Sequence, residues 1–356
     1  SAASDVYKRQ IMESFVFPGN IEPEISLIAS RPIPYMRTAA FSAVVKSSEQ
    51  MLLHLIGCPN GKVIFYTASG TGAMDAVVAN YVSRYKKIFI ISGGSFGDRW
   101  KNICDYYNLS STLYKIPFAK DIDYEDLEKK VASERPEIFL CQHHETSTGQ
   151  LFDLEKISVL CKKYNVSLVV DAISSFLADP LNMAELGIDI CITSSQKGLN
   201  IAPGLSFVIL SDKLSSVSFN ANGYYFDFEE NLNNLQRGQT PYSPATTLFL
   251  QLHERLKRDV ACGVDAIIST VRGRALYFRG LCKKYGWEVP AETPSNCITG
   301  FFVKRNGDIL FEKIMEKGIY IMPGGTPGYF RVSHLGIQDE KSLAALAETI
   351  HQVELL

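Results

Sequence analysis

The chain has 356 residues, a formal net charge of −2, 46% hydrophobic and 21% charged residues, a composition ordinary for a globular protein. The near-neutral charge excludes a general attraction to nucleic acid or to an anionic membrane surface. No apolar run approaches the roughly 20 residues that a membrane-spanning helix needs. The length allows two or three domains with sizeable cores.

The N-terminal residues lack the apolar core of a signal peptide, and we expect residues 1–14 to form a flexible leader. The eight cysteines include no CxxC pair, and most lie within apolar segments. This pattern predicts reduced, buried thiols in a cytoplasmic protein. Clustered Cys and His are absent, so we expect no metal site.

Short apolar strands alternate with amphipathic helices between about residues 60 and 211. The predicted strands are Lys62–Thr67, Ile88–Ser92, Thr112–Ile116, Ile138–His143, Ser167–Asp171, Ile188–Thr193 and Ser206–Leu210. The predicted helices are Gly72–Tyr85, Gly97–Tyr107, Tyr124–Glu134 and Leu154–Tyr164. Such alternation predicts an α/β fold with a mostly parallel, seven-stranded sheet covered on both faces. Parallel sheets bind ligands beyond the C-terminal ends of their strands.

The C-terminal part of the chain is predicted to differ in organisation. A break rich in Asn, Gly and aromatic residues spans 220–238, and a helical region bent near Gly263 follows. The remainder predicts a smaller α+β domain. Its expected strands are Cys297–Val303, Tyr320–Met322 and Tyr329–Ser333, with helices at Asp308–Glu316 and Lys341–Val353. We therefore expect a large domain over residues 15–250 and a small one over 251–356.

An aspartate and a lysine follow two of the predicted strands. Asp171 ends one apolar strand, and Lys197 comes just past the end of the next. A lysine amine can form a Schiff base with the aldehyde of pyridoxal phosphate, while a carboxylate keeps the pyridine nitrogen protonated. Each residue also has a simpler interpretation: Asp171 could be a helix N-cap, and Lys197 could be a surface lysine. Together they predict a pyridoxal phosphate enzyme.

Other strand ends carry weaker signals. The turn Thr67–Ala73 opens a helix, so its N–H groups could bind an anion or simply form a tight turn. Phe96 could stack on a planar cofactor or pack in the core. His143 and His144 invite a metal interpretation, but consecutive residues on a strand point to opposite faces.

Taken in order, these motifs resemble the class V pyridoxal-phosphate aminotransferases. That family includes alanine–glyoxylate, serine–glyoxylate and 2-aminoethylphosphonate–pyruvate transaminases, and the resemblance covers about residues 15 to 350. It implies a fold-type I transferase that works as a homodimer with active sites at the subunit interface. The motifs are Phe17-Pro18-Gly19, Ser69-Gly70-Thr71, the Gly-x-Phe-Gly-x-Arg run, Glu145-Thr146-Ser147-Thr148-Gly149, Asp171, Ser195-Gln196-Lys197 and Phe330–Gly336.

The resemblance also implies a role for each site residue. Lys197 would be the Schiff-base lysine, Asp171 the partner of the pyridine nitrogen, and Phe96 the residue stacked on the ring. Arg331 would bind the substrate carboxylate, because guanidinium is suited to two-pronged contacts; a surface ion pair is its simpler interpretation. The remaining cofactor contacts would be Ser69, Gly70, Thr71 and Gln196 at the phosphate, Thr146 near the ring hydroxyl, and Tyr242 and Ser243 reaching the phosphate of the neighbouring subunit.

The implied reaction moves an amino group from a small amino donor to a 2-oxo acid such as pyruvate or glyoxylate. The donor would be 2-aminoethylphosphonate or a small amino acid such as alanine or serine. The family's early His-Arg pair is replaced here by Tyr35-Met36-Arg37, so Arg37 is expected near substrate in an altered setting. Two alternatives stay open: a cysteine desulfurase or lyase, and a non-catalytic protein that retains the fold.

Overall fold

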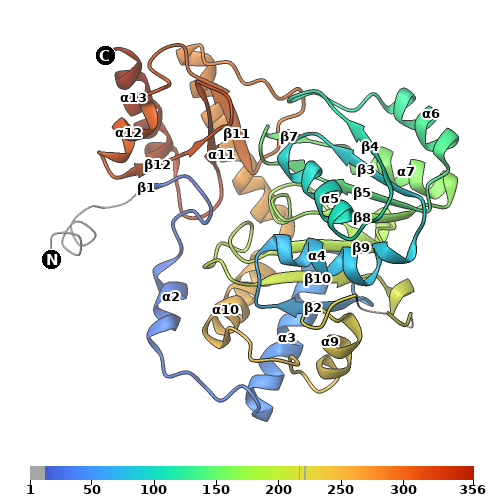
Figure 1. The fold of residues 1–356 in the computed structure, drawn as a ribbon. Coiled ribbons are helices and arrows are strands. Elements are labelled where there is room, and N and C mark those ends of the chain that lie inside the picture. The colour runs from blue at the N-terminus through green and yellow to red at the C-terminus, as the bar shows by residue number, and fades with distance from the viewer. Residues whose placement is uncertain (1–12, 216, 220–221) are drawn as a thin grey trace.

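A computed structural model describes residues 13–215, 217–219 and 222–356. Its centre is a seven-stranded sheet with the order β2-β10-β9-β8-β5-β3-β4 (Figure 1). The strands are β2 (Lys62–Tyr66), β3 (Ile88–Ser92), β4 (Ser111–Lys115), β5 (Ile138–Gln142), β8 (Ser167–Asp171), β9 (Ile190–Ser194) and β10 (Ser206–Leu210). Only β10 runs antiparallel to its neighbours, β2 and β9. The predicted α/β fold with a mostly parallel seven-stranded sheet is confirmed.

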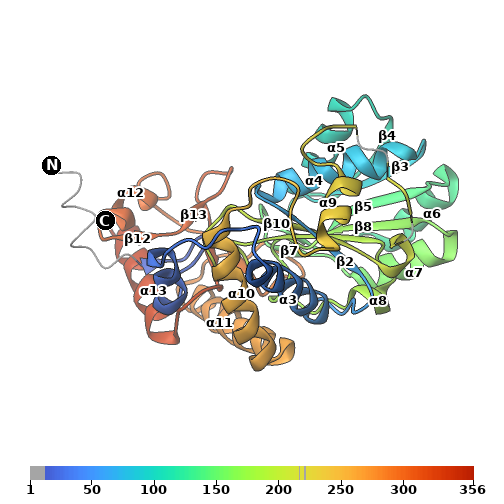
Figure 2. The same ribbon diagram turned by 90° about the horizontal axis from the view of Figure 1, so that it is seen from below.

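Alternate residues of the central strands enter two different cores. In β5, Phe139 packs in one core and Leu140 in the other, as the two-residue period of a strand requires. Helices α4 (Gly70–Asn80), α5 (Ser95–Tyr106) and α9 (Phe228–Leu235) cover one face. Figure 2 shows them opposite α3 (Ala39–Leu55) and α10 (Thr246–Cys262). Helices α6 (Tyr124–Glu134) and α7 (Leu154–Tyr164) pack in the same core as Phe139, α3 and α10.

Local signals explain where several helices begin and end. Thr38, Asp123 and Asp153 are in extended conformations and accept hydrogen bonds from the first turns of α3, α6 and α7. At the other end of α7, Asn165 adopts the left-handed conformation that closes many helices. The expected helices at 124–134 and 154–164 are therefore confirmed to the residue.

The C-terminal part builds a second, smaller sheet with the order β11-β14-β13. Its strands are β11 (Ile298–Phe302), β13 (Met322–Pro323) and β14 (Tyr329–Ser333). Helices α11 (Val264–Tyr285), α12 (Leu310–Met315) and α13 (Glu340–Glu354) pack against it. The expected bend is confirmed: α10 ends at Cys262 and α11 begins at Val264, with Gly263 at a φ of 86° between them.

Four expectations need correction. The stretch 220–238, expected to be a break, contains α9. The first helix after β2 starts at Gly70 instead of Gly72, and its last residues form a separate 3₁₀ turn. The strand expected at 320–322 is split into β12 (Ile319–Tyr320) and β13, and Ile321 between them is buried in the smaller core. The sequence analysis also placed no element over α3, a 17-residue helix.

The N-terminal segment joins the C-terminal part of the molecule. Strand β1 (Glu13–Ser14) pairs in parallel with β12, and Phe15 is buried in the core around β11 and β14. Residues 1–12 of the expected leader lie outside the described residues, whereas Glu13 and Ser14 are ordered in this strand. The domain limits 15–250 and 251–356 stay a prediction.

Within the described ranges, no helix combines the length and apolar character needed to cross a membrane. All eight cysteines are free thiols, and all but Cys262 are buried. This agrees with the expectation of reduced, packed cysteines.

Candidate active site

Asp171 and Lys197 come from two strands that pair directly. Strand β8 ends at Asp171 and runs parallel to β9, which ends three residues before Lys197. The C-terminal ends of parallel neighbours lie at the same edge of a sheet. The structure therefore brings the predicted carboxylate and amine to one edge.

A compact loop after β9 presents Lys197. The Ser195 hydroxyl donates to the Ala202 carbonyl at 2.9 Å and accepts from Leu205 N–H at 3.2 Å, which closes the loop at its base. Gly198 is required by close approach, because a Cβ there would lie 2.0 Å from the carbonyl oxygen of Phe176. The chain thus folds back immediately after Lys197 and fixes the point from which its side chain leaves.

The ammonium group of Lys197 lies over an aromatic ring. Its Nζ is 3.4 Å from the centroid of Phe17, a residue of the N-terminal segment. Burial lowers the pKa of Lys197 from its usual value to about 8, and the nearby cations Arg331 and Arg99 act in the same direction. A lysine with this pKa can exchange a proton near neutral pH, which suits a general base.

Asp171 is almost fully buried at 5% exposure, and burial raises the pKa of its carboxyl to about 7. The N–H of Ile173 donates to Oδ1 at 2.8 Å. No described residue donates a hydrogen bond to Oδ2. A cationic N–H placed against that oxygen would bring the pKa of Asp171 down again and ionise it.

The N-terminus of α4 faces the same region. Ser69 is extended and no side chain caps the helix, so its first N–H groups are available to an anion. A Cβ on Gly70 would lie 2.5 Å from the side chain of Ile173. The start of α4 is therefore packed against a residue that follows Asp171 by two positions. Arg99 donates to the Thr71 hydroxyl at 2.8 Å and adds a positive charge there.

The neighbouring helix α5 differs because its N-terminus is already filled. The buried Glu145 carboxylate accepts from the N–H groups of Phe96 and Gly97 at 3.3 and 3.1 Å. Gln142 donates to the same carboxylate at 3.0 Å. A second anion at this helix start would meet the charge of Glu145. Of the two helix N-termini, α4 is the one that suits a phosphate.

Phe96 and Arg331 each have a defined setting, while their predicted roles stay proposals. The guanidinium of Arg99 lies 4.8 Å from the ring centroid of Phe96. Arg331, on β14, donates to the carbonyls of Thr146 at 3.0 Å and Pro323 at 2.8 Å. Its buried Nε has no hydrogen-bond partner among the described residues.

Two further predicted residues have polar settings of their own. The Thr146 hydroxyl donates to the Ser174 hydroxyl at 2.8 Å, and the Ser174 oxygen lies 2.9 Å from Nδ1 of His144. Gln196, which directly precedes Lys197, has a buried Oε1 without a partner among the described residues. The roles predicted for Thr146 and Gln196 stay proposals.

Tyr242, Ser243 and Arg37 are not brought to Lys197 by any contact in the described chain. Tyr242 stacks on Tyr225 with centroids 5.2 Å apart. Arg37 donates to the carbonyls of Thr240 and Pro241 at 2.6 and 3.2 Å, and so holds the segment that carries Tyr242 and Ser243. Their predicted roles at cofactor and substrate stay proposals.

Sequence analysis gave no role to Phe17, Arg99 or Glu145. Arg99 could have been found, since it stands three residues after Phe96 and so lies on the same side of α5. Glu145 could have been found as an acidic residue between strand and turn. Phe17 belongs to one of the motifs that carry the resemblance, but its contact with Lys197 joins residues 180 positions apart, and no sequence pattern indicated it.

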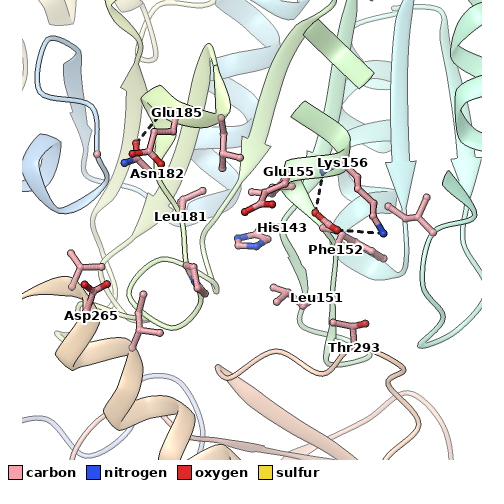
Figure 3. Close-up of a pocket in the computed structure, with 18 of the residues that line it drawn as sticks. His143, Leu151, Phe152, Glu155, Lys156, Leu181, Asn182, Glu185, Asp265 and Thr293 are labelled. Carbon is pink, nitrogen blue, oxygen red and sulfur yellow. Dashed lines mark hydrogen bonds and ion pairs between the residues drawn. The ribbon is translucent and has the colours of Figure 1, made fainter. Parts of the chain in front are cut away.

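A cavity of about 820 Å³ lies away from Lys197 and Asp171, which do not line it (Figure 3). His143 points into this cavity, whereas His144 turns to Ser174, so the two histidines do not share a site. Within residues 13–215, 217–219 and 222–356, no group of three or more His, Cys, Asp or Glu could hold a metal ion.

Comparisons with known proteins agree over most of the chain. The family described as Aminotransferase class-V matches residues 34–234. A serine–glyoxylate aminotransferase of Hyphomicrobium methylovorum is 25% identical over 344 residues, which cover 91% of this chain and 84% of that protein. A 2-aminoethylphosphonate–pyruvate transaminase of Pseudomonas aeruginosa strain UCBPP-PA14 is 27% identical over 334 residues, 89% of this chain and 90% of that protein.

The fold has close counterparts among solved structures. The crystal structure of an alanine–glyoxylate aminotransferase from Nostoc sp. superposes with a TM-score of 0.89 at 22% identity. The superposition covers 96% of this chain and 95% of that one. This likeness shows a shared fold.

We predict that Asp171→Asn stabilises the protein at pH 8 when no cofactor is added. The pKa of Asp171 in the folded protein, about 7, lies above its ordinary value of 3.8. The protonated carboxyl therefore contributes fully to stability below about pH 4, and this contribution is lost as the pH rises through 7. The amide keeps the Ile173 hydrogen bond without a charge. The gain in free energy of unfolding at pH 8 should be on the order of 2 to 4 kcal/mol.

Denaturant unfolding of both proteins at pH 4, 6 and 8 tests this expectation. The difference between them should shrink toward zero at pH 4. Equal stabilities at pH 8 would contradict the buried, unpaired carboxyl described above.

Proposed function

The chain belongs to the class-V aminotransferases, and we propose that it works with pyridoxal phosphate held between Asp171, Lys197 and the N-terminus of α4. The observation that carries this proposal is the pairing of β8 with β9. It sets a buried carboxyl and an amine of lowered pKa at one sheet edge, beside a helix start without a cap.

The donor and acceptor groups of the site fit this cofactor. The N–H groups of Gly70 and Thr71 suit a phosphate, with Ser69 and Gln196 as neighbouring polar groups. The free Oδ2 of Asp171 suits a protonated pyridine nitrogen. Phe96 offers a ring for stacking, and Thr146 a hydroxyl for the ring oxygen.

Pyridoxal phosphate, when bound, supplies an aldehyde and a ring that accepts electrons. Lys197 would hold the cofactor as its Schiff-base residue and, once displaced by an amino donor, take the proton from the donor's α-carbon. Asp171 would keep its negative charge opposite the pyridine nitrogen. Arg331 would orient the substrate by its acidic group, with its main-chain anchors fixing the guanidinium.

We propose a small amino donor and a 2-oxo acid as the substrates. Relatives named for serine with glyoxylate and for 2-aminoethylphosphonate with pyruvate support this class. Alanine is the third donor of the predicted set. Arginine binds a carboxylate or a phosphonate equally well, so Arg331 fits each of these donors.

We also propose a homodimer in the cytoplasm. Tyr242 and Ser243 have no contact with their own Lys197, which fits the role of reaching the phosphate in a second copy. Arg37 would then act at the same boundary, because it binds the carbonyls just before Tyr242. Eight free cysteines support a reducing compartment.

The cysteine desulfurase alternative is not supported. Such chemistry needs an accessible thiolate, whereas Cys297 is fully buried and burial raises its pKa far above the usual range. The class-V family match and the aminotransferase relatives instead support the main interpretation.

A half-reaction screen tests the proposed function. Purified protein incubated with pyridoxal phosphate should turn yellow and show the visible Schiff-base band. Serine, alanine and 2-aminoethylphosphonate would then be added singly, and the true donor should bleach the band. Glyoxylate or pyruvate should restore it. Protein that never shows the band would overturn the proposal.

We predict that Lys197→Ala abolishes the visible band and lowers turnover by about four orders of magnitude or more, since both the covalent link and the general base are lost. The measurements are the absorption spectrum and the steady-state rate. Lys213→Ala, which changes an exposed lysine paired with Asp189, is the control and should keep both. Near-normal turnover in Lys197→Ala would refute its role.

We predict that Arg331→Lys raises the KM for the 2-oxo acid about 10- to 100-fold. Lysine keeps the charge but loses the two-pronged contact and the anchors on Thr146 and Pro323. The Schiff-base band should remain, because Arg331 does not hold the cofactor in this scheme. Arg305→Lys, at an exposed arginine, serves as the control. An unchanged KM would show that Arg331 is structural.

A further inference from the structure

The Lys197 ammonium lies over the ring of Phe17, a residue 180 positions earlier in the sequence. The N-terminal segment is held beside the lysine loop by Asn200, whose side-chain amide donates to the Asn20 carbonyl at 3.0 Å. Gly19 allows the same segment to approach the loop after β14, since a Cβ there would lie 2.3 Å from the Leu335 carbonyl oxygen. The ring of Phe17 is therefore fixed in place.

Phe17 also packs against apolar residues. It lies against a small buried cluster made of Ala178, Val271, Cys297, Ile298 and Leu335. Four of these residues come from the C-terminal part of the chain, and Ala178 comes from the loop after β8. Phe17 itself is only partly buried, and Lys197 lies over its ring. The ring is thus supported mainly by the small C-terminal part.

Apart from Phe17, few groups stabilise the positive charge of Lys197. No described residue forms a hydrogen bond or an ion pair with its Nζ. The ionisable groups that influence it are Asp171 and Cys297, which favour the ammonium, and Arg99 and Arg331, which oppose it; the neutral His144 also lies close enough to feel its charge. Burial opposes the charge more strongly than any of them.

A cation over the face of an aromatic ring is attracted by the ring's negative π surface. The interaction reaches out to about 6 Å and contributes roughly 0.5 to 2 kcal/mol, more when the pair is desolvated. At 3.4 Å from the centroid, Nζ sits well inside this range. The contact therefore offsets part of the cost of burying the ammonium.

We propose that Phe17 is a positioning residue that holds Lys197 on its ring when the lysine is protonated and not bonded to the cofactor. The inference rests on the proposed function of Lys197. It adds a resting place for the displaced side chain, which neither the family match nor the site motifs supply.

This resting place would serve the proton transfer. When free Lys197 takes a proton from the donor's α-carbon, the C–H bond breaks, an N–H bond forms, and the electron pair stays with the substrate–cofactor system. The new ammonium must keep that proton until it is returned. Phe17 stabilises the charged state without offering an acceptor that could remove the proton, because a phenyl ring has no lone pair.

The pKa of Lys197 measures this interaction directly. We expect Phe17→Leu to lower it by about 0.4 to 1.5 units, since leucine keeps the apolar volume but has no π face. Phe17→Tyr, which keeps the ring, should stay within about 0.2 units of the wild type. Phe17→Met removes the ring in a second way and guards against a folding defect in the leucine variant.

The measurement is a pH titration by NMR of the full chain carrying ¹³C at the lysine Cε. The Lys197 signal is assigned by its loss in Lys197→Arg. The titration is run without cofactor and with pyridoxamine phosphate, whose amine cannot form a Schiff base with lysine. An unchanged pKa in both ring-less variants would overturn the proposal, as would an equal drop in Phe17→Tyr, which would indicate packing alone.

A second readout follows from the same shift. A lower pKa leaves more free amine at pH 7, so the Schiff-base band should form about two- to eightfold faster when Phe17→Leu is mixed with pyridoxal phosphate. Phe17→Tyr should match the wild-type rate. If the wild type forms no band at all, the proposed function fails, while the cofactor-free titration still decides the role of Phe17.

Discussion

The parallel pairing of β8 with β9 is the constraint on which the site depends. It brings Asp171 and Lys197 to one edge of the sheet, where both side chains are largely removed from solvent. Burial acts on the two groups in opposite directions: it raises the pKa of the carboxyl to about 7 and lowers that of the ammonium to about 8. Each group is thereby poised near neutral pH, and each can respond to a partner. A cation beside Asp171 would ionise it, and loss of the charge on Lys197 would free a nucleophile.

The N-termini of α4 and α5 complete this electrostatic arrangement, because a side chain occupies the N-terminus of α5 and none caps that of α4. Glu145 fills the start of α5 with a buried carboxylate, whereas α4 begins without a cap beside Arg99. Of these two helix starts, that of α4 is the one open to an anion. In the proposed scheme it would receive the phosphate of the cofactor, while Asp171 would face the pyridine nitrogen.

Much of this was predictable from sequence, and the exceptions have physical reasons. Strand–helix alternation predicted the sheet because its strands are apolar on both faces, and Asp123 and Asp153 marked their helices through local hydrogen bonds. Asp171, Lys197 and Arg331 were proposed because each follows or lies in a strand with a clear pattern, and the structure sets the first two at one edge of the sheet. Helix α3 was missed, as was α9 in a segment rich in Asn and aromatic residues. Phe17 could not be predicted, because its role depends on a tertiary contact between the two ends of the fold.

That contact links the small C-terminal part of the molecule to the proposed active site. Strand β1 pairs with β12, and Phe15 is buried in the smaller core, so the segment bearing Phe17 follows that part of the molecule. Arg331 is carried by the same sheet through β14. Lys197 and Asp171 belong to the large sheet. In the proposed scheme, the group that would receive the displaced lysine and the group that would orient the substrate therefore come from one part of the molecule, and Lys197 and Asp171 from the other. Any change in how the two parts meet would alter both functions together.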